Sequence, residues 1–287
     1  MKYDVILPIA RKDAYFVHRT VDYIQKNLIE VENIYIITNK KNFHILQRII
    51  DFHTNVVLLD ENTLLEGLSF QRIREYLNKY GAARITGWYF QQFLKLGFAK
   101  TPYANTYYLS WDADTIPLSP MKFEEDEKLC FDCKKEYHKP YFVPIYKLFG
   151  LEKAINDSFI AEHMLFEKEI VEEMIGKIEN QNGIQGDCWW KKIITSCDYS
   201  QSLNSFSEFE TYGTYAYSKN PTRYKLRHLA TFRKGGLING RFISDNMLSQ
   251  LAFDLDTVSF ELRDTPAFPL NIRCYLYRLW LKLKETC

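Results

Sequence analysis

The first third of the chain alternates short apolar runs with longer mixed segments, and this alternation restricts the fold more than any other feature of the sequence. Four apolar runs are short enough to be buried strands, namely residues 3–9, 34–38, 56–59 and 106–111. Three mixed segments repeat apolar residues at helical spacing, namely residues 43–50, 70–80 and 88–99. Helices that alternate with strands in this way indicate an α/β fold with a mostly parallel central sheet.

Beyond residue 120 the alternation weakens and the sequence becomes rich in aromatic residues. We expect a strand at residues 141–143 and an amphipathic helix at residues 167–179. Residues 270–284 combine apolar and aromatic side chains with four basic residues, which predicts a basic amphipathic helix. The chain should therefore form one large domain, residues 1–265, followed by a basic C-terminal segment, residues 266–287.

The charge balance and the cysteine pattern disfavour several classes of protein. With 37 Lys and Arg residues against 36 Asp and Glu residues, the chain lacks the net positive charge that nucleic-acid binding usually requires. Cys130 and Cys133 form a single C-x-x-C pair, whereas a structural zinc site would need a second pair or nearby histidines. The N-terminal run resembles a strand and not a signal peptide, and no stretch of about 18 apolar residues follows, so we expect a cytoplasmic protein.

An Asp-x-Asp tripeptide, Asp112-Ala113-Asp114, directly follows the aromatic strand predicted at residues 106–111. In open α/β sheets, ligands gather at the carboxyl ends of such strands. Two carboxylates at this spacing supply the hard oxygen ligands that Mg²⁺ or Mn²⁺ prefers, and a cation there can stabilise charge on a departing diphosphate. The alternative is a loop in which both carboxylates cap backbone N–H groups. The position after a buried strand favours the metal site.

Three segments resemble sequences of glycosyltransferases of the GT-A type. Residues 108–117 resemble the DxD segment of these enzymes, and residues 91–96 resemble the helix that precedes it in bacterial transferases of surface polysaccharides. Residues 206–213 are similar to a Ser-Glu-Tyr-Glu-x-Tyr-Gly segment of an incompletely characterised bacterial group of that kind, with Phe209 in place of the tyrosine. The resemblance spans roughly residues 3–220.

This resemblance implies a GT-A fold, a Rossmann-like fold of nucleotide-diphospho-sugar transferases, with a C-terminal helical appendage. It implies a hexosyltransferase-class enzyme that uses Mn²⁺ or Mg²⁺ to move a sugar from a nucleotide-diphosphate donor, such as a UDP-sugar. The acceptor would be a glycan or lipid-linked glycan in bacterial surface polysaccharide synthesis. Residues 1–120 would then form the nucleotide-sugar-binding half of the catalytic domain, and residues 121–265 the acceptor half.

The resemblance also suggests residues that border the donor. At the end of the first predicted strand, backbone groups and the carboxylate of Asp13 could form hydrogen bonds with the nucleotide base. The guanidinium of Arg11 could form two hydrogen bonds with a phosphate. The alternative for residues 11–13 is a solvated loop, and for Lys95 it is an exposed position on a helix. The expected donor-binding residues are Pro8, Ile9, Ala10, Arg11, Asp13, Gln92, Lys95, Trp111 and Asp112.

An inverting transferase needs a carboxylate that accepts the proton of the acceptor hydroxyl. Glu210 is the first candidate and Glu208 the second, because two acidic residues in an aromatic segment are costly to bury without a function. The alternative is a structural role in capping the nearby helix, and a retaining mechanism would need neither residue as a base. The expected metal ligands are Asp112, Asp114 and His163, although a histidine beside apolar residues is more often a structural residue.

Two other functions are compatible with the sequence. A nucleotidyltransferase that makes nucleotide-sugars shares the α/β layout, but residues 8–12 lack the glycine-rich loop of such enzymes. A noncatalytic sugar-binding subunit would use the aromatic residues to stack on sugar rings.

The basic C-terminal segment adds an expectation about location. The aromatic and basic side chains of residues 270–284 suit peripheral contact with the inner face of a membrane. The alternative is a helix docked on the catalytic domain with its aromatic side chains in the core.

Overall fold

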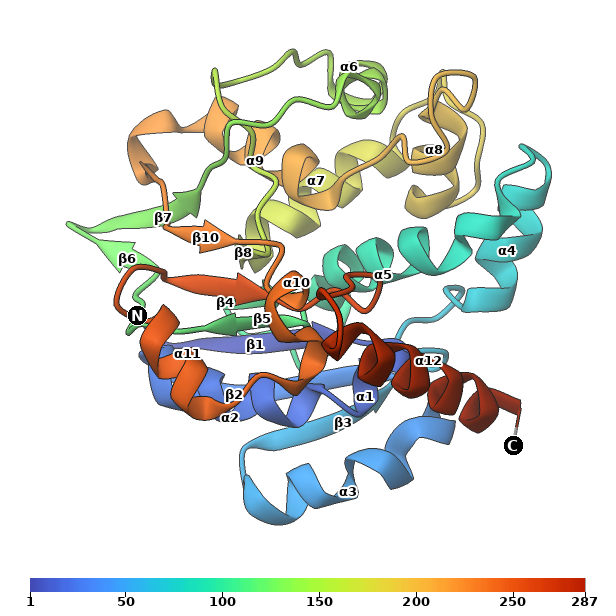
Figure 1. The fold of residues 1–287 in the computed structure, drawn as a ribbon. Coiled ribbons are helices and arrows are strands. Elements are labelled where there is room, and N and C mark those ends of the chain that lie inside the picture. Colours follow the sequence, from blue (N-terminus) through green and yellow to red (C-terminus); the bar gives the residue numbers. More distant parts are fainter. Residues whose placement is uncertain (287) are drawn as a thin grey trace.

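The computed structural model describes residues 1–286, and at its centre is a five-stranded sheet (Figure 1). The strand order is β3-β2-β1-β4-β8, in which the first four strands run parallel and β8 pairs antiparallel with β4. These strands are β1 (Tyr3–Pro8), β2 (Val31–Thr38), β3 (Val56–Asp60), β4 (Tyr107–Trp111) and β8 (His163–Glu167). The prediction of an α/β fold with a mostly parallel central sheet is confirmed.

The direction of strand addition reverses at β1, and this reversal determines where a ligand can bind. The chain passes outward from β1 to β3 and then returns to the other side of β1 to form β4. In open α/β sheets, ligands bind outside the carboxyl ends of the two strands that flank such a reversal. Here the loops that leave these strands begin at Ile9 and Asp112.

Helices connect the parallel strands and cover both sides of the sheet (Figure 1). In α2, Val17, Val21 and Ile24 are fully buried at helical spacing, which explains why this segment packs as a helix. The helices expected around residues 43–50, 70–80 and 88–99 are confirmed as α3, α4 and α5. The N-terminal helices are α1 (Arg11–Ala14), α2 (Val17–Asn27), η1 (Lys40–Asn42), α3 (Phe43–Phe52), α4 (Phe70–Asn78), η2 (Ala83–Ile85), α5 (Thr86–Gly97) and η3 (Phe98–Lys100).

The middle of the chain packs an aromatic core against β4 and β8. The ring of Phe166 on β8 lies 5.1 Å from that of Tyr108 and 4.6 Å from that of Tyr212, measured between centroids. The strands here are β5 (Thr115–Pro117), β6 (Glu124–Glu125), β7 (Lys128–Asp132), β9 (Tyr224–Arg227) and β10 (Thr231–Phe232). The helices are η4 (Lys139–Tyr141), α6 (Phe142–Phe149), α7 (Lys168–Glu179), α8 (Trp189–Ser196), α9 (Glu208–Lys219) and η5 (Pro221–Arg223).

The strand predicted at residues 141–143 is wrong, because this segment ends a 3₁₀ turn and begins α6. A run of three apolar residues does not distinguish a strand from the start of a helix. Stronger signals lie beside it: Pro140 and Pro144 suit the first turn of a helix, and Gly150, at φ 68°, ends α6 in the left-handed conformation. The helix expected at residues 167–179 is confirmed as α7.

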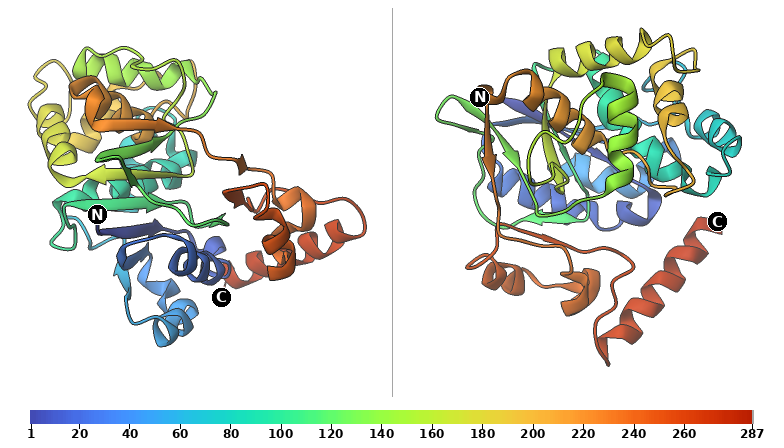
Figure 2. Two further views of the ribbon diagram at one scale, coloured as in Figure 1. Left: turned by 90° about the vertical axis from the view of Figure 1, so that its left-hand side faces the viewer. Right: turned by 90° about the horizontal axis from the view of Figure 1, so that it is seen from above.

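Residues after 235 form a smaller lobe beside the carboxyl ends of the parallel strands (Figure 2). Its elements are α10 (Gly236–Asn239), η6 (Gly240–Phe242), α11 (Asp245–Leu251), β11 (Thr257–Ser259) and α12 (Leu270–Thr286). A second apolar core, which includes Phe16, Ile116 and Phe260, joins this lobe to the main body. The basic helix expected at residues 270–284 is confirmed as α12, although Cys287 lies outside the described residues. In residues 1–286, no helix is both long and apolar enough to cross a membrane.

One glycine in the aromatic core provides a test of this packing. A Cβ atom at Gly213 of α9 would lie 2.3 Å from Cγ of the buried Phe159, whereas nothing lies within 4 Å of a Cβ at Gly176 of α7. We expect Gly213→Ala to lower the free energy of unfolding by about 3 kcal/mol, because the ring cannot move without opening the core. The control, Gly176→Ala, should raise it by about 0.5 kcal/mol. Urea denaturation of both variants is the measurement, and similar values for the two would contradict the packing described here.

Candidate active site

The acidic tripeptide lies at the carboxyl end of β4, next to the end of β1, where the direction of strand addition reverses. Asp112 N donates to Glu162 O at 2.9 Å, and Thr115 N donates to Asp112 O at 3.0 Å, so the backbone is held on both sides. The side chains of Asp112 and Asp114 are 36% and 27% exposed. Both carboxylates are therefore accessible to a ligand at the position where this type of sheet binds one.

A buried lysine on α5 connects Asp112 to the helix that carries the candidate bases. Lys95 Nζ lies 3.0 Å from Asp112 Oδ1 and 2.8 Å from Glu208 Oε1, and its side chain is 5% exposed. The ammonium also lies 4.2 Å from the centre of the Phe209 ring. Burial alone would lower the pKa of Lys95, but the carboxylates of Asp112 and Glu208 raise it above its ordinary value. Lys95 is thus a buried neighbour of the acidic pair and not an exposed helix residue.

Asp114, unlike Asp112, is surrounded mainly by other carboxylates. The partial burial of this carboxylate, together with the carboxylates of Asp13 and Asp112, raises the pKa of Asp114 to about 7. Arg241, from the C-terminal lobe, partly offsets this effect, since its Nη2 lies 3.9 Å from Asp114 Oδ2 and 2.6 Å from Asp13 Oδ1. The Arg241 guanidinium also donates to two backbone carbonyls at 3.0 Å, which fixes its position.

The acidic pair fits a hard divalent cation, because such ions prefer carboxylate oxygens and a positive charge would offset the repulsion between the two side chains. The structure contradicts His163 as a third ligand. Its Nε2 is bonded to Asp132 Oδ2 at 2.7 Å, and its ring stacks on Trp111 with centroids 4.5 Å apart. Across residues 1–286, no three His, Cys, Asp or Glu side chains form a group that could hold a metal. Further ligands would have to come from a bound substrate or from water.

The backbone groups expected to read a nucleotide base are partly engaged within the protein. Gln91 Nε2 donates to Pro8 O at 2.7 Å, and Thr38 Oγ1 donates to Ile9 O at 2.9 Å. The N–H of Ile9 also donates a hydrogen bond, to Ile37 O. The carbonyls of Pro8 and Ile9 therefore hold β1 to its neighbours, and the exposed Ala10 is the first residue of this segment that a ligand could reach.

Three other residues expected at the donor have different positions. Asp13 is paired with Arg241, whereas Arg11 Nε is buried without a hydrogen-bond partner among the described residues. Trp111 is fully buried, and its indole N–H donates to Thr115 O at 2.8 Å. The prediction that Trp111 contacts the donor is therefore wrong, because its side chain lies in the core and not at the ligand face.

The two candidate bases stand at the start of α9, which two side chains hold in place. Ser207 Oγ accepts the N–H of Glu210 at 3.2 Å, as an N-cap residue does. Gln92 Oε1 accepts the N–H of Glu208 at 2.9 Å, so Gln92 positions α9. The carboxylate of Glu208 then faces Lys95, and through it Asp112.

Glu210 faces the loop before β8. Its side chain is buried, with 1% of the residue exposed, and its Oε2 accepts hydrogen bonds from Ser158 Oγ and from Phe159 N. Burial raises the pKa of Glu210. Glu210 therefore holds the loop before β8, and Glu208 is the candidate base that contacts Lys95 beside the acidic pair.

A further charged cluster borders the acidic pair. The carboxylate of Glu162 binds Lys134 Nζ and lies 2.5 Å from Arg233 Nε. Although burial alone would raise the pKa of Glu162, Lys134 and Arg233 hold it below its ordinary value. No sequence pattern identified Lys134, Arg233 or Arg241, because these residues come from distant parts of the chain and belong to no recognisable motif.

The sequence model of a family of unknown function, DUF6492, matches residues 2–235. The chain belongs to this family. The matched region contains the acidic pair, Lys95 and Glu208, and it ends before Arg241. No curated protein matches the chain.

Several solved structures are similar to the chain at low sequence identity. Mouse xyloside xylosyltransferase 1 in its apo form has 8% identity and a TM-score of 0.47, over 93% of this chain and 100% of that one. The galactosyltransferase LgtC in complex with donor and acceptor sugar analogues has 11% identity and a TM-score of 0.46, over 96% and 94%. The apo form of the glycosyltransferase GlyE of Streptococcus pneumoniae TIGR4 has 10% identity and a TM-score of 0.42, over 100% and 64%.

The ion pairs of Lys95 predict a large effect on stability. In Lys95→Met the buried carboxylate of Glu208 and the partly buried carboxylate of Asp112 would lose their shared cation, which should lower the free energy of unfolding by about 3 kcal/mol. Lys100→Met is the matched control, since Lys100 pairs with Glu179 at the surface and should contribute less than about 1 kcal/mol. Urea denaturation distinguishes them, and a Lys95→Met value within the control's range would contradict the role of this charge.

Proposed function

We propose that the protein is a glycosyltransferase of the GT-A type, which moves a sugar from a nucleotide-diphosphate donor to a glycan or lipid-linked glycan. The observation that carries this proposal is the position of Asp112 and Asp114, two accessible carboxylates at the carboxyl end of β4 beside the reversal at β1. The segments that resemble bacterial surface polysaccharide transferases support the same reading. They favour a UDP-sugar as the donor and polysaccharide synthesis as the process.

The acidic pair would hold Mn²⁺ or Mg²⁺ in this proposal. When bound, the cation would act as a Lewis acid on the diphosphate that leaves the sugar. The protein's own residues prepare this position: Lys95 fixes the orientation of Asp112, and Arg241 limits the repulsion between Asp13 and Asp114. Ala10 and the unpaired Arg11 Nε border the same edge and are the remaining candidates for contacts with the donor.

Glu208 is the carboxylate that we propose on the acceptor side. Its Oε1 is held at 2.8 Å by Lys95, which fixes the direction of the carboxylate toward the acidic pair. In an inverting reaction Glu208 would accept the proton of the acceptor hydroxyl. Glu210 holds the loop before β8 and would not contact the acceptor.

Removal of one charged ligand tests the metal site. We expect Asp112→Asn and Asp114→Asn to lower turnover by about 100-fold or more with the fold retained. Asp254→Asn, at an exposed position in the C-terminal lobe, is the control and should keep wild-type activity. Transfer or hydrolysis should be measured with a panel of nucleotide-sugars, after EDTA and again with Mn²⁺ added. Near-normal turnover in both acidic-pair variants would contradict the proposed site.

The two candidate bases can be separated by paired substitutions. Glu208→Gln keeps the shape of the side chain and loses its basicity, so kcat should fall by about 100-fold while donor affinity stays close to wild type. Glu210→Gln should leave kcat within a few-fold of wild type, because that carboxylate serves the loop. Steady-state kinetics and donor titration supply both quantities. A larger loss of kcat in Glu210→Gln than in Glu208→Gln would reverse the assignment.

We also propose that α12 contacts an anionic membrane surface. Four large side chains recur at helical spacing on one face, and their exposed fractions are 52% for Ile272, 66% for Tyr275, 57% for Leu276 and 45% for Leu279. An unpartnered apolar face of this kind suits insertion among lipid headgroups. Peripheral contact would bring the active site close to a lipid-linked acceptor.

The opposite face of α12 docks on the lobe, so the helix is neither free nor fully buried. Cys274 and Leu281 are 5% and 4% exposed, and the ring of Tyr277 lies 5.3 Å from that of Phe242. Exposed basic residues flank the apolar face on both sides, with Arg273 and Lys284 on one and Lys282 on the other. Each contributes about 1 kcal/mol near anionic lipid, which makes the association salt-sensitive and reversible.

Vesicle sedimentation tests this contact. Wild-type protein should pellet with phosphatidylglycerol vesicles at low salt and be released at about 0.5 M salt, where charges are screened. The double variant Leu276→Glu and Leu279→Glu should remain in the supernatant. Phe253→Glu is the control, because Phe253 is 87% exposed elsewhere on the same lobe. Equal pelleting of all three forms, or none by wild type, would contradict the membrane contact.

A further inference from the structure

A single guanidinium from the C-terminal lobe reaches two carboxylates of the candidate active site. Arg241 Nη2 lies 2.6 Å from Asp13 Oδ1 and 3.9 Å from Asp114 Oδ2, and the Arg241 side chain is 4% exposed. A divalent cation shared by Asp13 and Asp114 would need the space that this nitrogen occupies, because carboxylate oxygens approach Mg²⁺ to about 2.1 Å. The guanidinium therefore stands where an ion bound by these two side chains would lie.

The other contacts of Arg241 hold this guanidinium in place. Its Nε donates to Phe260 O and its Nη1 to Lys12 O, each at 3.0 Å. The guanidinium also lies 5.1 Å from the centre of the Phe16 ring. Each of its three nitrogen atoms thus has a partner, and an arginine side chain does not lose its charge. The positive charge is a fixed part of the site.

The lobe holds the backbone of the acidic pair by separate contacts. Phe260 N donates to Asp114 O at 2.7 Å, and Thr115 Oγ1 lies 2.7 Å from Ser259 Oγ. These bonds join β11 to the loop that carries Asp114, and none of them involves the Arg241 side chain. The charge of Arg241 can therefore be removed while the lobe still holds this loop.

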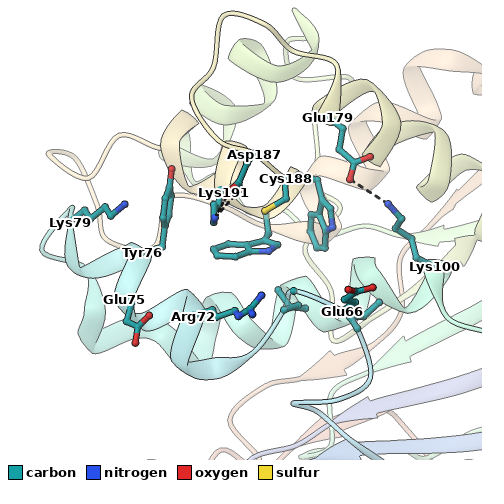
Figure 3. A pocket seen from close by; sticks show the side chains of 15 residues that line it. Glu66, Arg72, Glu75, Tyr76, Lys79, Lys100, Glu179, Asp187, Cys188 and Lys191 are labelled. Carbon is teal, nitrogen blue, oxygen red and sulfur yellow. Dashed lines mark hydrogen bonds and ion pairs between the residues drawn. The ribbon is translucent and has the colours of Figure 1, made fainter.

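A pocket on the other side of α5 shows what a balanced set of charges looks like (Figure 3). Two lysines there each face one carboxylate, Lys100 with Glu179 at 3.3 Å and Lys191 with Asp187 at 2.8 Å. A divalent cation would gain little in this pocket, because it would have to displace a lysine from each carboxylate that it approached.

The charges at the acidic pair are not balanced in this way. The side chains of Asp13, Asp112 and Asp114 bring three negative charges, and their ion-pair partners within residues 1–286, Lys95 and Arg241, bring two positive ones. One negative charge is left over, and without Arg241 two would be left. Since the attraction for a cation grows with the net negative charge near it, Arg241 reduces that attraction.

We propose that Arg241 sets the affinity of the acidic pair for a divalent cation. Its guanidinium keeps Asp13 out of the metal site and weakens the attraction of Asp114 for an ion, so that the site holds a free cation loosely. A loosely held ion can leave the protein together with the diphosphate product, which binds it directly. The inference rests on the proposed function, because it takes Asp112 and Asp114 as the metal ligands.

Titration with Mn²⁺, followed by the paramagnetic resonance of the free ion, tests this role without donor or turnover. Wild type should bind Mn²⁺ saturably. Arg241→Gln should bind it about tenfold more tightly, because the variant lacks a positive charge 3.9 Å from the Asp114 carboxylate. Arg241→Lys keeps the charge and should lie closer to wild type than to the Gln variant. Unchanged or weaker binding by Arg241→Gln would overturn the proposal.

Two matched controls separate the charge at the site from other effects of the substitution. Arg278→Gln loosens the same lobe, since Arg278 donates from α12 to Leu262 O at 2.8 Å and to Asp264 O at 2.6 Å, but it leaves Arg241 in place. Arg72→Gln removes a positive charge from the pocket of Figure 3. Both controls should bind Mn²⁺ as wild type does, and tighter binding by either, to the extent seen in Arg241→Gln, would overturn the proposal.

The same titration distinguishes failure of this inference from failure of the proposed metal site. Saturable binding of equal strength in wild type and in the Arg241 variants would overturn the inference alone. No Mn²⁺ binding by any form would overturn the inference together with the metal site. If Arg241→Gln does not fold, Arg241→Met makes the same test, because its unbranched side chain can keep the contact with Phe16.

Discussion

The charge of Lys95 is the constraint on which the arrangement of the site depends. An ammonium group in a protein core is very costly unless carboxylates surround it, so α5 can pack where it does only if Asp112 and Glu208 are both brought to it. The same residue also accepts a hydrogen bond at its carbonyl from the hydroxyl of the buried Tyr108, at 3.0 Å. The end of β4, the start of α9 and the last turn of α5 are therefore held as one unit, and Asp112 is oriented before any ligand arrives.

The two members of the acidic pair consequently differ. Asp112 is compensated directly by Lys95, whereas Asp114 faces Asp13 and has the more distant Arg241 as its counter-charge. A cation arriving from solvent would therefore relieve more repulsion at Asp114 than at Asp112. Asp112 is therefore held in place by the protein, whereas the charge of Asp114 would be balanced fully only by a bound cation.

The features that could be predicted from the sequence are those encoded by neighbouring residues. Strand and helix periodicity predicted the parallel sheet, and an aromatic run predicted the strand that ends at Trp111, directly before Asp112, because both patterns are local. The sequence does not show which side of a strand end faces the ligand, so Trp111 and His163 were placed at the site although they stack on each other in the core. Contacts between distant segments also could not be predicted, because no local pattern encodes them. The pairing of Arg241 with Asp13 is the clearest case.

The position of Arg241 has a consequence for the family as a whole. This residue reaches Asp13 from η6, outside the region that the family has in common, and η6 in turn packs against α12, where a Cβ atom at Gly240 would lie 2.3 Å from the sulfur of Cys274. A relative with a different C-terminal lobe would keep the same strand ends and the same carboxylates but would need another source of positive charge beside them. Variation in this lobe would therefore change the charge beside the carboxylates, while the shared scaffold keeps the strand ends in place.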